Sequence, residues 1–251
     1  MLQPVGKRCG VLVNGIAAQQ GAPGDYAALS QTPALVALQN TQPLREAIAA
    51  GVEQAQQPQF SEAGAAEISD RQMAYWMQDL SEILLLDYIF SQQRRIGNID
   101  CLDYWYWKTG RNIRKQLART RTPPKNMARH KPLRIQDTVI SNNSSSGLPS
   151  CRNLTREAGL LQKLAHFNPD TYKRLIRLDR DFSRQDELYR YLQQNFSLSE
   201  EQLQQIISNT REAAEILKGS CKEKRLRFDL DPTSFFVRGS SRGKRLNCDN
   251  P

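Results

Sequence analysis

The sequence has few of the residues from which metal centres and disulfide frameworks are built. It contains 2 histidines, His130 and His166, and 5 cysteines, and no two cysteines form a Cys-x-x-Cys pair. Structural zinc sites need closely spaced cysteine and histidine ligands, so this pattern argues against such a site. The odd number of cysteines argues against a complete disulfide framework but allows one or two bridges. We therefore expect the cysteines to be mostly reduced and structural.

Long apolar segments are also absent. The sequence has no run of ~18 apolar residues, the length that a membrane-spanning helix needs. Residues 1–10 lack the apolar core segment of a secretory signal peptide. The longest apolar stretch, residues 83–90, is short and contains Asp87. We therefore expect a soluble protein without a membrane span, and we predict a cytoplasmic location.

Positive charge is in excess. The chain has 35 Lys and Arg against 26 Asp and Glu, which gives a formal net charge of +9. This balance favours anionic partners such as nucleic acid, a nucleotide phosphate or an acidic membrane surface. The basic residues are densest at 111–131 and 238–245. Solvated surfaces and a flexible end are the simpler interpretation of these two stretches.

The length and composition fit a globular protein. The 251 residues are 39% hydrophobic and 24% charged, which allows one large domain or two small ones. We divide the chain into an N-terminal segment, residues 1–68, a mostly helical domain, residues 69–237, and a flexible basic tail, residues 238–251. The first segment is rich in Ala, Gln, Gly and Pro, and we expect it to contain a strand and helices.

Hydrophobic periodicity predicts the helices. The clearest runs from Asp70 to Phe90, where Ser69 and Gln72 have capping-box spacing. Its last turns are apolar nearly all round, so we expect this helix to be buried at the centre of the domain. Other helices are expected over residues 33–39 and 43–56, and from about Asn168, Ser183 and Ser199, the last with Gln202 in a capping box and ending at Gly219.

The remaining segments predict a few strands between the helices. Strands are expected over residues 8–16, in the aromatic run from Tyr104, and over 133–140, with a basic extended loop at 119–132 and an extended piece at 226–230. Residues 141–147 have the composition of a turn. Together these patterns predict an α+β fold that is predominantly helical.

The order of a buried helix, a polar loop, two strands and an amide-rich turn is typical of a phosphotransfer site. Such a site needs an Asp to orient the attacking hydroxyl, an Asn that binds Mg²⁺, and a further Asp that bridges the metal to the phosphates. Residues 84–98 resemble the catalytic loop of atypical kinases of the HipA and secretory-pathway (Golgi casein kinase-like) type. Arg95, Gly97 and Asn98 match that loop, whereas Arg94 occupies the position of the catalytic Asp.

The resemblance covers about residues 70–235 and implies a kinase-like C-terminal lobe with a reduced N-terminal region. It implies ATP and Mg²⁺ as ligands, with Arg95, Asn98, Asn142 and Asn143 as cofactor-binding positions. Asn98 and Asn142 are the positions implied for the metal. The N-terminal segment carries no Gly-rich phosphate loop.

The departures from the family pattern predict loss of transfer chemistry. A cation replaces the base at Arg94, and amides replace the metal carboxylate at 142–143. Losing a catalytic carboxylate costs several orders of magnitude in rate. We therefore predict a pseudokinase, a regulatory or scaffold module with a protein partner, in which Arg94 can bind a phosphate directly.

Two alternatives remain open at the level of sequence. The first is an active atypical kinase that uses other carboxylates, namely Asp87, Asp100 or Asp103. The second is a basic nucleic-acid-binding protein, although no helix-turn-helix, zinc or RNA-recognition signature is present. Its phosphate contacts would come from Arg111, Arg114, Lys115, Arg119, Arg121, Lys125, Arg129 and Lys131.

Overall fold

The computed structural model describes residues 7–8, 28–57, 68–93, 99–110, 112–139, 152–183, 187–238 and 243–251. Within these ranges the chain is a mixed α+β structure that is mostly helical, so the predicted fold class is confirmed. The strand β1 covers Lys7–Arg8 only, and the rest of the strand predicted over residues 8–16 lies outside the described residues.

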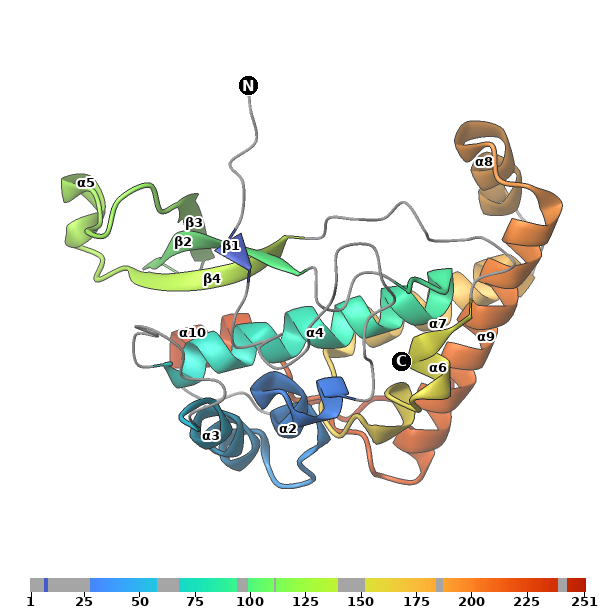
Figure 1. Cartoon of the computed structure of the whole chain (residues 1–251), viewed down its shortest axis with the longest axis horizontal. Coiled ribbons are helices and arrows are strands. Elements are labelled where there is room, and N and C mark those ends of the chain that lie inside the picture. Colours follow the sequence, from blue (N-terminus) through green and yellow to red (C-terminus); the bar gives the residue numbers. More distant parts are fainter. Residues whose placement is uncertain are drawn as a thin grey trace.

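The helix α4, Asp70–Phe90, is buried at the centre of the molecule as predicted. It separates the sheet from the helices α2 and α3 (Figure 1). The Ser69 hydroxyl accepts the backbone N–H of Gln72 at 3.2 Å, so the predicted N-cap is present. The Gln72 side chain, however, does not complete the capping box, because it pairs with the backbone of Gln136.

The helices α2, Pro33–Gln39, and α3, Leu44–Ala55, confirm the two helices predicted in the N-terminal segment. Both pack on α4, and their apolar residues belong to the same core as those of the later helices. The two helices approach each other closely at Gly51. A Cβ atom there would lie 2.8 Å from Cβ of Ala37 and 2.9 Å from the carbonyl oxygen of Pro33, so only glycine allows this approach.

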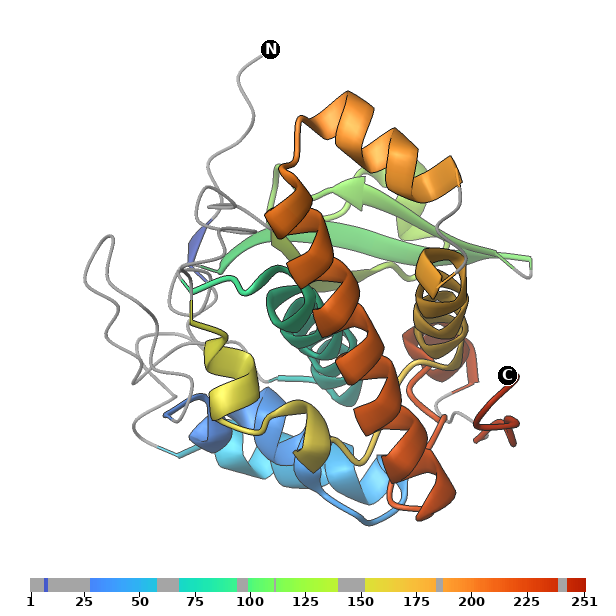
Figure 2. The same ribbon diagram turned by 90° about the vertical axis from the view of Figure 1, so that its right-hand side faces the viewer.

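The C-terminal half of the chain is a block of helices, as predicted. The long helix α9 packs across α4 and α7 (Figure 2). Ser199 and Gln202 form the predicted capping box. Two predicted boundaries are wrong: Ser183 is the last residue of α7 rather than a cap, and α9 continues past Gly219 to Lys222. The helices are α6, Leu154–Glu157, α7, Pro169–Ser183, α8, Glu187–Phe196, α9, Glu200–Lys222, and α10, Pro232–Arg238.

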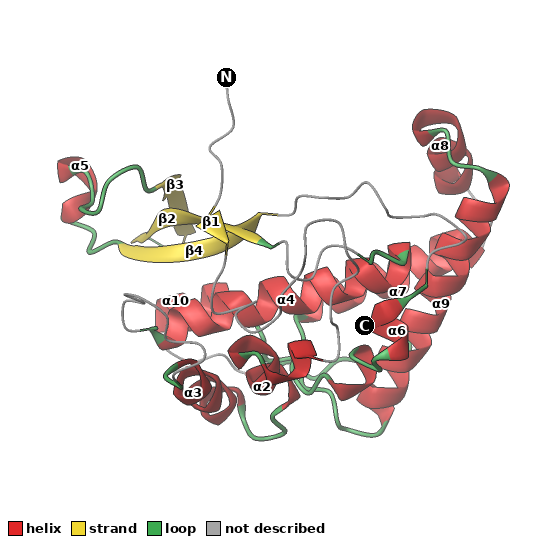
Figure 3. Cartoon of the chain, in the orientation of Figure 1, coloured by secondary structure: helices red, strands yellow, loops and turns green. Residues whose placement is uncertain are grey.

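One small antiparallel sheet lies on one side of the helices (Figure 3). The order is β3-β2-β4, and β1 pairs with the first residues of β2. The strand β3 was not predicted, and the short helix α5 lies within residues 119–132, which the sequence suggested to be one extended loop. Residues 226–230 form no strand, only an isolated bridge between Arg227 and His166. The elements are β2, Asp100–Thr109, β3, Asn112–Leu117, α5, Lys125–Ala128, and β4, Leu133–Val139.

The last nine residues, which belong to the predicted flexible tail, contain a disulfide-bonded cysteine that the prediction of mostly reduced cysteines did not include. Residues 243–251, which we call the C-terminal strap, are joined to α9 by a disulfide between Cys221 and Cys248. The Tyr172 hydroxyl donates to the carbonyl oxygen of Cys248 at 2.5 Å. Disulfides persist mainly in oxidising compartments, so the bridge weighs against the predicted cytoplasmic location.

Among the described helices, none has the length and apolar character needed to cross a membrane.

Candidate functional site

The five residues that the kinase resemblance singles out lie outside the described residues. Arg94, Arg95 and Asn98 belong to the segment between Gln93 and Ile99. Asn142 and Asn143 belong to the segment between Val139 and Arg152. The structure therefore bears on the predicted site through the residues that flank these two segments.

The first segment follows the C-terminal end of α4, which is closed by two asparagine side chains. Nδ2 of Asn153 donates to the carbonyl oxygen of Tyr88 at 2.7 Å, and Nδ2 of Asn209 donates to that of Ile89 at 3.0 Å. These carbonyls have no intrahelical partner in the last turn of a helix. We call Asn153 and Asn209 the amide clamp. It fixes the point at which the chain leaves α4.

The end of α4 is further ordered by Ser91, whose left-handed backbone (φ 49°) ends the helix. Its hydroxyl accepts Nδ2 of Asn209 at 3.1 Å and Nε2 of Gln205 at 3.2 Å. Asn209 is 4% exposed, and its Oδ1 accepts a hydrogen bond from Arg156 at 2.9 Å. One buried amide thus connects α4, α6 and α9.

The residues that flank the two undescribed segments contact each other at both ends. Nε2 of Gln93, before the first segment, donates to the carbonyl oxygen of Arg152, after the second, at 2.9 Å. Asp100, after the first segment, pairs with Val139, before the second, in the antiparallel register of β2 and β4. The residue before the first segment therefore lies beside the residue after the second, and the residue after the first lies close to the residue before the second.

The strand β4 is held on α4 by two side chains of that helix. The amide of Gln72 pairs with the backbone of Gln136, through bonds of 2.7 Å and 3.0 Å. Oδ2 of Asp79 accepts the backbone N–H and the hydroxyl of Thr138 at 3.0 Å and 2.9 Å. These contacts fix the end of β4, from which the second segment continues.

Asp79 is the carboxyl whose ionisation this arrangement perturbs most clearly. Burial raises the pKa of Asp79 from 3.8 to about 7, and the neighbouring carboxylate of Asp137 acts in the same direction. The hydrogen bonds from Thr138 oppose the rise. Because the folded pKa exceeds the unfolded one, Asp79 contributes stability below about pH 4, and this contribution is lost as the pH rises to 7.

We therefore expect Asp79→Asn to reduce the pH dependence of stability. In the parent protein, Asp79 should make the free energy of unfolding roughly 2.5 kcal/mol lower at pH 8 than at pH 5. Asparagine does not ionise but still accepts from Thr138, so the variant should lack this contribution. Urea unfolding at pH 5 and at pH 8 measures the difference in the free energy of unfolding for each protein. Asp181→Asn, a matched charge change on α7, should keep the parent's difference, and a similar loss in both variants would contradict the role of Asp79.

The structure describes the side chains of two of the three carboxylates named for the active-kinase alternative. Asp87 is fully buried, and Asp103 forms an ion pair with Arg134 at 2.5 Å. Of Asp100 only the backbone is described. Elsewhere, Asp231 caps α10 by accepting the backbone N–H of Ser234 at 3.0 Å.

The basic stretch of the nucleic-acid alternative is spread over β3, α5 and the neighbouring turns. Lys115 is bound to Asp137 at 2.6 Å, and Arg111 lies outside the described residues. A hollow of about 370 Å³ beside Trp107 is lined by Arg114, Arg129 and His130. The other basic residues named for this alternative, Arg119, Arg121, Lys125 and Lys131, are exposed.

The amide clamp was not predicted from the sequence. The available signal was weak: Asn209 falls on the apolar face of α9 between Ile206 and Ala213, where an unpaired amide is unfavourable. Asn153 gave no comparable signal. Within the ranges that the structure describes, no group of three His, Cys, Asp or Glu side chains is placed to hold a metal ion.

Comparisons of the chain with protein-family models, with curated proteins and with solved structures gave no match.

Proposed function

We propose that this chain is a degenerate kinase-like protein, a pseudokinase that acts as a regulatory or scaffold module and binds a nucleotide phosphate. The order of elements supports the proposal: a buried helix, a first segment with Arg94 and Asn98, strands β2 to β4, and a second segment with Asn142 and Asn143. In kinases the catalytic loop and the metal-binding turn occupy these places in the chain.

The observation that carries the proposal is the meeting of the segment ends. A phosphotransfer site requires its two loops to reach the same phosphate group. Gln93 contacts Arg152, and Asp100 pairs with Val139, so residues on both sides of each segment are held together. Two loops of one binding site must lie close together, and the ends of these two segments do so although about forty residues of sheet and turn separate the segments in the sequence.

The residues available argue for binding rather than transfer. Arg94 has no capacity to accept a proton, because the guanidinium remains charged in proteins. Asp87 and Asp103 are engaged, the first by burial and the second by Arg134. Guanidinium groups bind phosphate oxygens through paired hydrogen bonds, so Arg94 suits a nucleotide phosphate. Asn98 and Asn142 offer amide oxygens to an accompanying Mg²⁺.

The test is thermal unfolding of the full chain with ATP, with and without Mg²⁺. ATP at ten times its Kd should stabilise the fold by about 1.4 kcal/mol and raise the Tm by roughly 3–6 °C. Arg94→Ala should remove most of this shift, whereas Arg190→Ala, an exposed charge on α8, should keep it. A complete lack of nucleotide shift, or a shift that survives Arg94→Ala, would reject the proposal.

A second experiment tests the loss of chemistry. The double variant Arg94→Asp, Asn142→Asp restores the two carboxylates that the family pattern requires. We expect phosphate transfer from ATP to be absent in the parent chain and measurable in the double variant if the rest of the site is intact. Transfer by the parent chain itself would show that the protein is an active kinase instead.

A further inference from the structure

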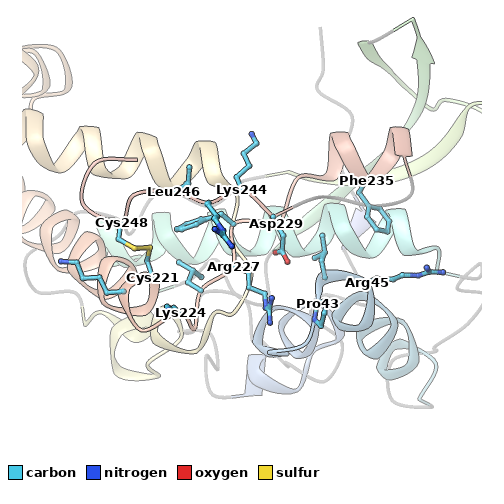
Figure 4. Close-up of a pocket in the computed structure, with 16 residues that line it drawn as sticks. Pro43, Arg45, Cys221, Lys224, Arg227, Asp229, Phe235, Lys244, Leu246 and Cys248 are labelled. Atoms are coloured by element: carbon cyan, nitrogen blue, oxygen red, sulfur yellow. A yellow bond between two sulfur atoms is a disulfide. The ribbon is translucent and has the colours of Figure 1, made fainter.

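A groove of about 930 Å³ lies on a different part of the molecule from the amide clamp. It is bordered by the start of α3, residues 224–229, α10 and the C-terminal strap. Figure 4 shows the disulfide between Cys221 and Cys248 at one end of the groove and Arg45 at the other. Along α9 the groove begins about 20 Å from Asn209, given 1.5 Å per helical residue.

The groove has a strong excess of positive charge. Among the described residues that line it, the only carboxylate belongs to Asp229, which is buried and bound to Nδ1 of His166 at 2.8 Å. Lys222 and Lys244 have ion-pair partners outside the lining, at 2.8 Å and 4.0 Å. The described basic residues that line it are Arg45, Lys222, Lys224, Arg227, Lys244 and Arg245.

Four of these cations have no carboxylate partner among the described residues. Arg45, Lys224 and Arg245 are exposed and form no ion pair with any of those residues, and Arg227 donates only to the carbonyl oxygen of Thr41. They come from three separate parts of the chain. Like charges repel each other when they are gathered without counter-charges, so this arrangement is unfavourable unless an anion neutralises it.

The floor and one end of the groove add two further features. Phe228 and Phe235 are buried beneath it and give it an apolar base. The helix α3 starts at its rim, and the N-cap position, Pro43, provides no side chain to satisfy the first N–H groups. Free N–H groups at a helix start favour an anion. The volume is within the range of small-molecule sites.

We propose that this groove binds a small polyanion with two or more phosphate or sulfate groups. The proposal does not rest on the kinase-like function, because neither residue of the amide clamp lines the groove and the cations that carry it are other residues than Arg94 and Asn98. The strap contributes Lys244 and Arg245, and the bridge to Cys221 holds the strap in place. The disulfide therefore helps to keep Lys244 and Arg245 at the groove, together with the hydrogen bond from the backbone N–H of Lys244 to the carbonyl oxygen of Phe228 at 2.9 Å.

The experiment is a titration of the oxidised full chain with pyrophosphate at constant ionic strength, in which calorimetry measures the heat of binding. The triple variant Arg45→Gln, Lys224→Gln, Arg245→Gln should weaken pyrophosphate binding by about tenfold or more, because each residue supplies a charge-assisted hydrogen bond. The control Arg174→Gln, Arg190→Gln, Arg211→Gln makes the same charge change on exposed faces of α7, α8 and α9. It should change the Kd by less than about twofold.

The outcomes distinguish a specific anion site in the groove from nonspecific electrostatic attraction between the positively charged protein and the anion. Equal weakening in the groove variant and in the control, or no heat of binding with the parent chain, would overturn the proposal. Replacing Cys221 and Cys248 by serine should also weaken binding, because Lys244 and Arg245 lose one of the contacts that hold them at the groove. Parallel titrations with ADP and with a sulfated disaccharide distinguish a phosphorylated ligand from a sulfated one. An ATP-induced Tm shift that the groove variant removes and Arg94→Ala keeps would support the groove and count against the kinase-like site.

Discussion

Replacing Cys221 and Cys248 by serine is expected to lower the free energy of unfolding by roughly 3.5 kcal/mol. The bridge closes a loop with a sequence separation of 27 residues, and the loss of entropy that such a loop imposes on the unfolded chain gives this value. The other contacts of the strap are weaker. Lys222 and Asp249 form an exposed ion pair, which contributes little.

Urea unfolding under non-reducing conditions measures this effect, and the Tm should fall by about 10 °C. The control is Asn250→Ala, which removes a surface contact of the same strap to Arg180 and should change stability by less than about 0.5 kcal/mol. Unchanged stability in the double serine variant, or free thiols at both positions in the native protein, would contradict the prediction.

The second large effect is expected for Asn209→Ala, which removes one half of the amide clamp. The substitution leaves the buried carbonyl oxygen of Ile89 without its bond, and the buried Ser91 hydroxyl loses one of its two donors. Each buried polar group left without a partner costs about 1–3 kcal/mol. We expect a loss of roughly 3 kcal/mol in the free energy of unfolding, measured by urea titration.

The matched control is Asn195→Ala. Nδ2 of Asn195 also donates to a backbone carbonyl, that of Tyr191 at 3.0 Å, but this bond is exposed on α8. Water replaces an exposed bond, so the control should stay within about 0.5 kcal/mol of the parent. If the two substitutions cost the same, the burial of Asn209 at the end of α4 does not have the importance we assign to it.

The Asn209→Ala variant also connects stability to the proposed function. The clamp fixes the end of α4, from which the segment with Arg94 continues. A looser helix end positions Arg94 less well, and small displacements weaken binding that depends on orientation. At a temperature where the variant remains folded, its Kd for ATP should therefore rise, whereas the control should bind ATP like the parent.

The helices show how far local sequence reaches. The limits of α4 and of α2 followed from apolar spacing and from Ser69 and Pro33, which lie within one turn of the elements they begin. The same kind of argument was wrong at Gly219. Glycine often follows a helix end. Here α9 continues for three residues past Gly219, because Leu217 before it and Cys221 after it are packed in the core.

The candidate site shows the opposite case. The sequence named Arg94 and Asn142 from a motif, and these stay predictions, because they lie outside the described residues. It gave no means of finding the partners of the flanking residues. Asn153 and Asn209 reach α4 across 65 and 120 residues of chain, so only the packing of α6 and α9 on α4 determines these bonds.

The sequence by itself therefore determined the fold class, the central position of α4 and the positive charge, since apolar spacing, caps and composition act within a few residues. The tertiary structure decided what those features do. In the folded chain the Gln72 side chain binds β4 instead of completing a helix cap. The predicted flexible tail is joined to α9 through Cys248. It also gathered cations from three parts of the chain into one groove. These contacts depend on which surfaces meet, and that is settled by the burial of apolar surface over the whole core.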